Sequence, residues 1–342
     1  MKESVAAALN RLTLERCVPL SAQLELTWRC PLRCRHCYLG PAPKWRELSA
    51  AEWRSALRQL KGLGCLFLVL TGGEPLLRKD LPELCRHATK LGFDIRIFTT
   101  GLGLSRGLLK ELAGCNVSGF ELSFYGRPAT HDAVTGLPGS AGATLAAARL
   151  AKNNGFKVKL KTPLMKPTLG ELAFIRKLAR REGFGFSLDP VLTRPAGGEQ
   201  SLRKLRVSGA KLKALLADRD LNPLVKNGLG LSDPASPVCG AGRNTVNISP
   251  YGQVRPCLQL NVPLGNLRKK KLRAVWKDSA WLKRWRRVRA ADIKDCAGCA
   301  AADYCSRCPG VSLLETGKID RPYPTACLLA KSQARGARGA MI

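Results

Sequence analysis

Three cysteines, Cys30, Cys34 and Cys37, occupy one short segment directly after an alternating apolar run at residues 24–28. Soft thiolates select zinc, copper(I) and iron–sulfur clusters, so this segment can hold three corners of a metal centre. No fourth cysteine lies nearby, since Cys17 precedes the run and Cys65 follows well after it. An iron–sulfur cubane on these three thiolates would therefore keep one iron open to an outside ligand.

A structural zinc site is the alternative interpretation of this segment. Structural zinc sites prefer four closed ligands in paired spacing. The spacing here is three residues and then two, which is not that pattern, and His36, a possible fourth ligand, is wedged between two of the cysteines. The segment therefore favours an iron–sulfur cluster over zinc.

The spacing of the cysteines, with Tyr38 directly after them, resembles the signature loop of the radical S-adenosylmethionine (radical SAM) superfamily. The resemblance implies a [4Fe–4S] cluster on Cys30, Cys34 and Cys37, whose open iron is chelated by the amino and carboxylate groups of S-adenosylmethionine (SAM). It also implies that reduction of this cluster splits SAM to give a 5′-deoxyadenosyl radical.

A second motif, Gly72-Gly73-Glu74-Pro75, follows the apolar run at residues 66–70. It therefore stands at the C-terminal end of a predicted strand, where the active sites of barrels are built. Two glycines allow positive φ and leave no Cβ, so the backbone can approach a ligand closely. The segment resembles the GGEP motif of the radical SAM family, which implies contact with the amino group of SAM.

Other residues are assigned to SAM by the same resemblance. Tyr38 follows the cysteine loop, Thr100 ends the third predicted strand and Ser123 ends the fourth. Lys161 and Asp189 end the fifth and sixth strands and are expected at the same mouth. The pair His131-Asp132 receives no role, and the sequence identifies no general acid or base.

Six strand-like runs alternate with helix-like ones, which predicts an α/β fold of parallel βαβ units. Capping boxes at 49–52 and 168–171 predict two helix starts. The strands are expected near residues 24–28, 66–70, 93–99, 119–124, 157–161 and 184–188. Periodicity leaves a doubly wound sheet and a barrel both open. The radical SAM resemblance implies a partial, TIM-like (β/α)6 barrel over residues 22–232, after a lead-in over residues 1–21.

The composition of the sequence changes at a predicted linker, residues 232–237. Beyond this linker the chain is rich in cysteines and predicted loops. A hairpin is expected from the strand at 244–248 through the turn at 250–252. The pairs Cys296/Cys299 and Cys305/Cys308 are five residues apart. Paired zinc knuckles need a connection of roughly 12–20 residues, so this spacing favours wrapping around a larger cubane.

The whole set of late cysteines resembles the SPASM domain, a C-terminal extension of radical SAM enzymes that holds two auxiliary iron–sulfur clusters. The resemblance assigns Cys239, Cys257 and Cys308 to auxiliary cluster I. It assigns a second set to auxiliary cluster II, namely Cys296, Cys299, Cys305 and Cys327. Two residues rather than the usual three separate Cys305 from Cys308, and no eighth cysteine lies near Cys239. These departures leave three alternatives for auxiliary cluster I: it is open at one iron, it is completed by another side chain, or it is smaller. The smaller domain is predicted over residues 233–330, with a basic disordered tail at 331–342.

The formal net charge of +32 is extreme for 342 residues. Such a field attracts nucleic acid, anionic surfaces or acidic peptides without specificity, although basic residues spread over solvated faces are the simpler explanation. The densest stretch is residues 268–289, where Trp276, Trp281 and Trp285 recur at helical spacing. This spacing favours a buried helix face over a stacking platform for nucleic acid.

Many cysteines without an export signal or a long apolar run indicate a reducing cytoplasm. The family resemblance implies a radical SAM–SPASM oxidoreductase that modifies a C–H bond, most often in a ribosomally made peptide, by crosslinking or residue oxidation. Only about twenty residues precede the barrel, so a separate small leader-binding protein is expected, with flavodoxin or ferredoxin as reductant. Two alternatives are modification of a tetrapyrrole, and a basic iron–sulfur protein that binds nucleic acid or transfers electrons.

Overall fold

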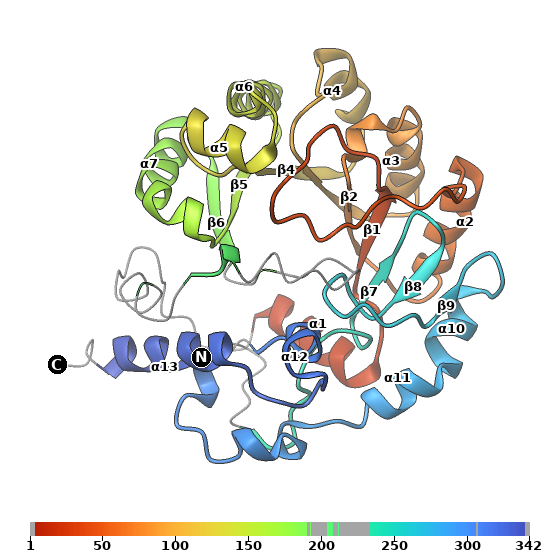
Figure 1. Cartoon of the computed structure of the whole chain (residues 1–342). Coiled ribbons are helices and arrows are strands. Elements are labelled where there is room, and N and C mark those ends of the chain that lie inside the picture. The colour runs from red at the N-terminus through yellow and green to blue at the C-terminus, as the bar shows by residue number, and fades with distance from the viewer. Residues whose placement is uncertain are drawn as a thin grey trace.

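The computed structural model describes residues 4–189, 192, 204–207, 211, 233–305 and 307–338, and one long sheet runs through it (Figure 1). The strands lie in the order β6-β5-β4-β3-β2-β1-β7-β8-β9. Their bounds are β1 Ser21–Thr27, β2 Phe67–Gly72, β3 Asp94–Thr99, β4 Val117–Ser123, β5 Val158–Pro163, β6 Gly185–Asp189, β7 Thr245–Ile248, β8 Gln253–Arg255 and β9 Gly265–Asn266.

Helices follow most of the strands and pack on the outside of the curved sheet (Figure 1). The first part of the chain contains α1 Val5–Arg16, α2 Ala50–Lys61, α3 Leu81–Lys90, α4 Arg106–Leu112, α5 Pro128–Thr135, α6 Ser140–Asn153 and α7 Leu172–Glu182. The second part contains α10 Leu272–Asp278, α11 Ala280–Trp285, α12 Pro309–Thr316 and α13 Pro324–Arg338. None of the described helices combines the length and the apolar character that crossing a membrane requires.

Strands β1 to β5 each pair in parallel with the next strand in the chain, which makes β6 an edge of the sheet. This order confirms the six predicted strands and the partial (β/α)6 barrel, and it excludes the doubly wound sheet, whose strand order reverses at a switch point. Because the strands are parallel, their carboxyl ends meet at one edge of the barrel. The residues expected to bind SAM come together at that edge.

The two faces of the barrel sheet differ sharply in chemistry. Side chains alternate between faces along a strand, and the outer set is buried against the helices, as for Leu24, Leu70, Ile97 and Phe120. The inner set is largely polar. The register aligns Phe98, Glu121, Lys159 and Gly185 across four strands in one inner row, and Ser123 with Lys161 in the row above.

The predicted hairpin is confirmed, and it extends the barrel sheet. Strand β7 pairs in parallel with β1, and β8 returns antiparallel to β7. The cysteine-rich part of the chain is thus joined to the barrel through main-chain hydrogen bonds at β1. The predicted boundary at residue 232 lies outside the described residues.

The tryptophans of the basic stretch belong to the core. Trp276 and Trp285 are 3% and 2% exposed, and their indole N–H groups donate to the carbonyls of Cys17 (2.8 Å) and Ala241 (2.6 Å). Trp281 stacks on Trp285 and packs against the core at its edge. The structure therefore confirms the buried-face interpretation and removes these rings as a platform for bases.

Two local predictions were wrong. The capping box at 49–52 forms as expected, but Thr168 and Glu171 do not form the second one. Instead Thr168 Oγ1 bonds to the backbone of Met165 inside a 3-10 turn, and Glu171 pairs with Arg127. The tail is also not irregular throughout, because α13 continues to Arg338; residues 339–342 lie outside the described part.

Candidate functional site

A cavity of about 260 Å³ opens at the carboxyl ends of the barrel strands and is called the upper cavity below. Side chains from the cysteine loop and from the ends of β2 to β6 line it. The lining includes Cys30, Cys34, Cys37, Tyr38, Gly72, Gly73, Thr100, Ser123, Lys161 and Asp189. The structure thus brings together all three cysteines of the first motif and most of the residues expected to contact SAM.

The cysteine loop is fixed by main-chain hydrogen bonds to the end of α5. The amide of Arg33 donates to Thr135 O and that of Arg35 donates to Val134 O, both at 2.9 Å. Inside the loop, the Cys37 amide donates to Cys34 O at 3.0 Å, which makes a tight turn. These contacts set the direction of the three thiols before any metal binds.

The three thiols suit a cationic metal centre. Burial is the main cause that raises the pKa of each, and it takes the pKa of Cys34 to about 12 with added repulsion from Cys37 and Cys30. Three thiolates so close together need positive charge, which a cluster core supplies. Among the described residues no three His, Cys, Asp or Glu side chains converge on a single-ion site.

The two glycines of the second motif pack directly on the segment that leads into Cys30. Gly72 has φ of +129°, and a Cβ there would lie 2.2 Å from Thr27 O; a Cβ on Gly73 would lie 2.3 Å from Arg29 O. The Gly73 amide donates to Thr27 O at 2.7 Å. The glycines therefore hold two parts of the site together, and they also leave open backbone toward the upper cavity.

Glu74 and Pro75 do not line the upper cavity, although both are buried. The Glu74 carboxylate accepts hydrogen bonds from Thr99 Oγ1 (2.6 Å), the Thr100 amide (2.7 Å) and the Leu76 amide (3.0 Å). It ties the end of β2 to the end of β3. In this structure the side chain of Glu74 positions Thr100 instead of facing the cavity.

Tyr125 is a site residue that the sequence analysis missed. It follows β4, is 3% exposed and lines the upper cavity, where its hydroxyl hydrogen-bonds Ser123 and Cys34 and lowers the pKa of the Cys34 thiol. His36 and His131 pack against its ring at centroid distances of 5.0 and 5.1 Å. The signal in the sequence was its place two residues after Ser123, because side chains two apart in an extended segment share a face.

A buried ion pair that the sequence analysis also missed joins the barrel to the hairpin. Glu25 on β1 is 0% exposed and lies 3.2 Å from Arg255 on β8. Tyr38 donates to the same carboxylate at 3.0 Å. Burial is the main cause that raises the pKa of Glu25, and Arg255 and Tyr38 oppose it. Glu25 thereby links Tyr38, which follows Cys37, to Arg255, which lies two residues before Cys257.

The late cysteines influence one another's pKa values in two groups, while their assignment to two clusters stays a prediction. The charges of Cys239 and Cys308 act on Cys257, and burial takes the pKa of Cys239 to about 11 with a further rise from Cys308. Cys327 and Cys299 act on Cys296, and Cys296 and Cys327 act on Cys305. Burial is the main cause that raises the pKa of Cys308, and the charge of Asp189 adds to it. Leu258 and Gln259, directly after Cys257, line the upper cavity.

Comparison with known proteins agrees with this geometry. The radical SAM superfamily profile matches residues 24–179, and the profile of the SPASM iron–sulfur cluster-binding domain matches residues 239–309. The chain is 31% identical over 300 residues to PqqA peptide cyclase of Xanthomonas axonopodis pv. citri, covering 82% of this chain and 80% of that protein. It is 32% identical over 258 residues to PqqA peptide cyclase of Rhodopseudomonas palustris, covering 70% and 67%.

Two solved structures share the fold at low identity. Streptococcus suis SuiB bound to S-adenosylmethionine superimposes with a TM-score of 0.71 at 18% identity, over 91% of this chain and 77% of that one. The enzyme anSMEcpe with bound AdoMet also gives 0.71 at 18% identity, over 94% and 98%.

Fold and site together define a partial-barrel enzyme built around three thiols at the barrel mouth. The chain belongs to the radical SAM superfamily, in the group that carries a C-terminal SPASM domain. Its cofactors are the [4Fe–4S] cluster and SAM in the barrel, and auxiliary iron–sulfur clusters in the SPASM domain.

Proposed function

We propose that this enzyme oxidatively modifies a C–H bond in a ribosomally made peptide, by forming a crosslink or oxidising a residue. The observation that carries the proposal is the 31% identity, over four fifths of both chains, to a protein named as a peptide cyclase. With cluster and SAM bound, one-electron reduction supplies a 5′-deoxyadenosyl radical that abstracts hydrogen from the substrate.

The residues of the upper cavity divide the work of holding these groups. Cys30, Cys34 and Cys37 would hold the cluster that SAM completes. Gly72 and Gly73 line the upper cavity and would offer backbone to the SAM amino group, and a Cβ on either would collide with Thr27 or Arg29 just before the cysteine loop. Tyr38, Glu74, Pro75, Thr100, Ser123 and Lys161 are the further proposed SAM-site residues, and Glu74 acts through Thr100.

The auxiliary groups would serve electron removal or substrate placement. We assign Cys239, Cys257 and Cys308 to the set nearer the barrel mouth, and the place of Leu258 and Gln259 in the wall of the upper cavity supports this assignment. The second set is Cys296, Cys299, Cys305 and Cys327. We further propose a cytoplasmic setting, a flavodoxin or ferredoxin as reductant, and a small leader-binding protein that presents the peptide.

The experiment that tests this function is mass spectrometry of candidate precursor peptides after anaerobic incubation with the reconstituted enzyme, SAM and a reductant. Formation of a crosslink or an oxidised residue lowers the peptide mass by about two hydrogens. With a peptide that carries deuterium at the attacked position, the deuterium appears in 5′-deoxyadenosine. If no peptide changes mass and none stimulates SAM cleavage, the peptide proposal fails.

A further inference from the structure

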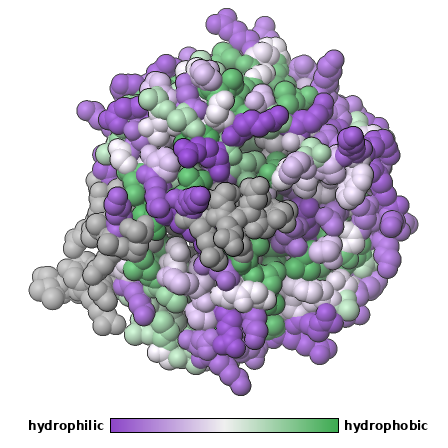
Figure 2. Space-filling view, in the orientation of Figure 1, coloured by the Kyte–Doolittle hydropathy of each residue, from purple (hydrophilic) through white to green (hydrophobic). Residues whose placement is uncertain are grey.

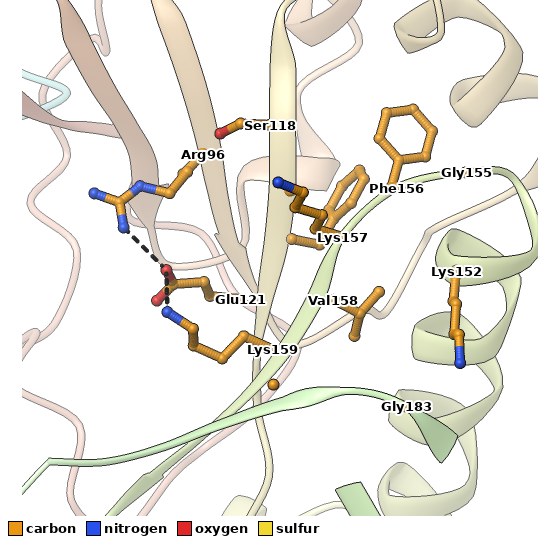
Figure 3. A pocket seen from close by; sticks show the side chains of 13 residues that line it. Arg96, Ser118, Glu121, Lys152, Gly155, Phe156, Lys157, Val158, Lys159 and Gly183 are labelled. Atoms are coloured by element: carbon orange, nitrogen blue, oxygen red, sulfur yellow. Dashed lines mark hydrogen bonds and ion pairs between the residues drawn. The ribbon is translucent and has the colours of Figure 1, made fainter. Parts of the chain in front are cut away.

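A second cavity, called the lower cavity below, lies toward the amino ends of β4, β5 and β6 (Figure 3). Its volume of about 680 Å³ falls in the range of roughly 300–1,000 Å³ that ligand pockets occupy. The charged members of its wall are Arg96, Glu121, Lys152, Lys157 and Lys159. Four basic side chains and one acidic side chain therefore line this cavity.

The one carboxylate in the lower cavity is shared among three cations. Glu121, whose side chain is 8% exposed, lies 3.2 Å from Arg96 and 3.6 Å from Lys159 through Oε1, as the dashed lines of Figure 3 show. Its other oxygen lies 3.5 Å from Lys161. One negative charge thus balances three positive ones in a half-buried place, where the interior has a lower dielectric constant than water. The surplus favours a bound anion.

The remaining basic groups extend this surplus to the rim. Lys152 on α6 lies over the Phe184 ring and donates to the carbonyl of Glu182. Lys157 is exposed, and no acidic partner for it is found among the described residues. Hydrophilic side chains also cover much of the surface in the view of Figure 2, so general surface charge must be separated from this cavity by experiment.

Glycines form part of the wall of the lower cavity. Gly119 and Gly185 lie on the inner face of β4 and β6, and Gly155 and Gly183 lie in the loops before β5 and β6. A Cβ on Gly119 would lie 2.7 Å from Lys157 O and one on Gly185 would lie 3.3 Å from Lys159 Cγ, so these two glycines allow β5 to approach closely. A Cβ on Gly155 would meet nothing within 4 Å, so the wall is open there. Phe156 and Val158 add apolar surface to the same wall.

The upper and lower cavities share a wall residue, since Glu121 lines both of them. Lys161, the partner of Glu121 Oε2, belongs to the upper cavity only. Along β5, Lys159 and Lys161 are two residues apart, which is about 7 Å at roughly 3.3 Å per residue. An extended peptide covers that span with about two residues of its own.

We propose that the lower cavity binds an acidic side chain of the substrate, an aspartate or glutamate about two residues from the modified position. The charged cluster of Arg96, Glu121 and Lys159 would receive this carboxylate while the target residue lies in the upper cavity. This inference rests on the proposed peptide function and adds the substrate class: a peptide with an acidic residue at that separation.

The test measures binding to the holoenzyme under anaerobic conditions by fluorescence anisotropy. The probe is a rhodamine-labelled octapeptide of alternating glycine and glutamate, compared with its glutamine twin. The double variant Arg96→Gln/Lys159→Gln removes two charges from the lower cavity, and Lys110→Gln/Lys270→Gln removes two from exposed positions on other faces. We expect the cavity variant to bind the acidic probe at least tenfold more weakly, and the control variant less than twofold.

Equal losses in the two variants, or no loss in either, would overturn the proposal, because binding would then reflect only the overall charge. Should the cavity double variant not fold, Lys157→Gln at the exposed rim replaces it, with an expected loss of about threefold against no loss for Lys110→Gln. A diazirine placed beside the glutamate should label residues 118–121 or 155–159, and labelling elsewhere would contradict the proposal. Binding is scored without turnover, so an enzyme that selects the acidic probe and yet modifies no peptide would refute the function and not the cavity.

Discussion

The two ends of the barrel interior differ in their residues and in the interactions that hold them. The upper end has three thiols and a pair of glycines locked together by main-chain contacts, and a Cβ on either glycine would meet backbone at 2.2 or 2.3 Å. The lower end has charged side chains between 42% and 44% exposed around one buried carboxylate. The upper end is therefore rigid by steric exclusion, whereas the lower end is held by ion pairs that a ligand can exchange.

This difference separates two tasks that a closed barrel cannot separate. The interior of a complete (β/α)8 barrel is filled by layers of apolar side chains, so ligands reach only its upper face. Here the inner rows carry Arg96, Glu121 and Lys159 in place of such layers. In this account the upper cavity carries out the reaction, and the lower cavity selects the substrate.

A methyl group at Gly73 is the most damaging small change to the upper end. Gly73→Ala must displace the segment before Cys30, and misplacing reacting groups by about 1 Å can cost on the order of 100-fold in rate. We expect 5′-deoxyadenosine formation to fall by about that factor. Gly142→Ala is the matched control, since a Cβ there meets nothing within 4 Å in α6; full retention in both variants would show that the upper end is not rigid.

Charge removal at the lower end should affect substrate binding rather than the reaction. Arg96→Gln should lower kcat/KM for an acidic peptide about tenfold, with the change in KM rather than in kcat, which is the signature of lost uniform binding. Steady-state kinetics of the modified peptide measure this. A fall confined to kcat would place Arg96 in the chemistry and erase the distinction between the two ends.

Buried His131, which packs against Tyr125 in the wall of the upper cavity, should make the stability of the folded protein sensitive to acid. His131 is 1% exposed, and burial lowers its pKa to about 4, so the unfolded state binds a proton below roughly pH 6.5 that the folded state refuses. Stability is thus lost as pH falls from 6.5 towards 4. Between pH 7.5 and 5.5 this should cost about 1.3 kcal/mol.

The measurement is urea unfolding at the two pH values, with His131→Gln as the comparison. A glutamine keeps an acceptor for the Tyr125 amide, which donates to His131 Nδ1 at 3.3 Å. The variant should lose less stability on acidification than the wild type by the stated amount. Identical losses would show that His131 is protonated in the folded protein.

The smallest predicted effect concerns Tyr125. A hydrogen bond to a thiolate ligand stabilises the more negative, reduced state of a cluster, so Tyr125→Phe should lower the reduction potential of the barrel cluster. If the bond is worth about 1 kcal/mol more in the reduced state, the change is about 40 mV. Potentiometric titration followed by electron paramagnetic resonance measures it; an unchanged potential would show that the hydroxyl does not reach the ligand.

Much of this molecule could be predicted because its signals are local. The spacing of Cys30, Cys34 and Cys37, the Gly72-Gly73 pair and the apolar strand runs each lie within a few neighbouring residues. The strand ends were also accessible, since parallel strands bring residues such as Ser123 and Lys161 to one edge. The division of the late cysteines into two cluster sets followed from family resemblance and stays a prediction.

The rest depends on register and on contacts distant in the chain. Glu25 and Arg255 are separated by 230 residues, and only the pairing of β7 with β1 brings them together. Nothing in the sequence distinguishes Glu121 from the other acidic residues, and only the strand register aligns it with Phe98 and Lys159. The failed capping box at Thr168 shows the same limit, because Glu171 was bound by Arg127 from another helix start.

The central claim is that three thiols at the barrel mouth hold an iron–sulfur cluster which SAM completes. It is tested most directly by anaerobic reconstitution, reduction and quantification of 5′-deoxyadenosine from SAM, alongside iron and zinc analysis. The account predicts that the wild type and the Cys115→Ala variant form 5′-deoxyadenosine. The Cys34→Ala variant should form none and should contain about four fewer iron atoms per chain than the wild type. Zinc in place of iron, or equal 5′-deoxyadenosine from Cys34→Ala, would contradict it.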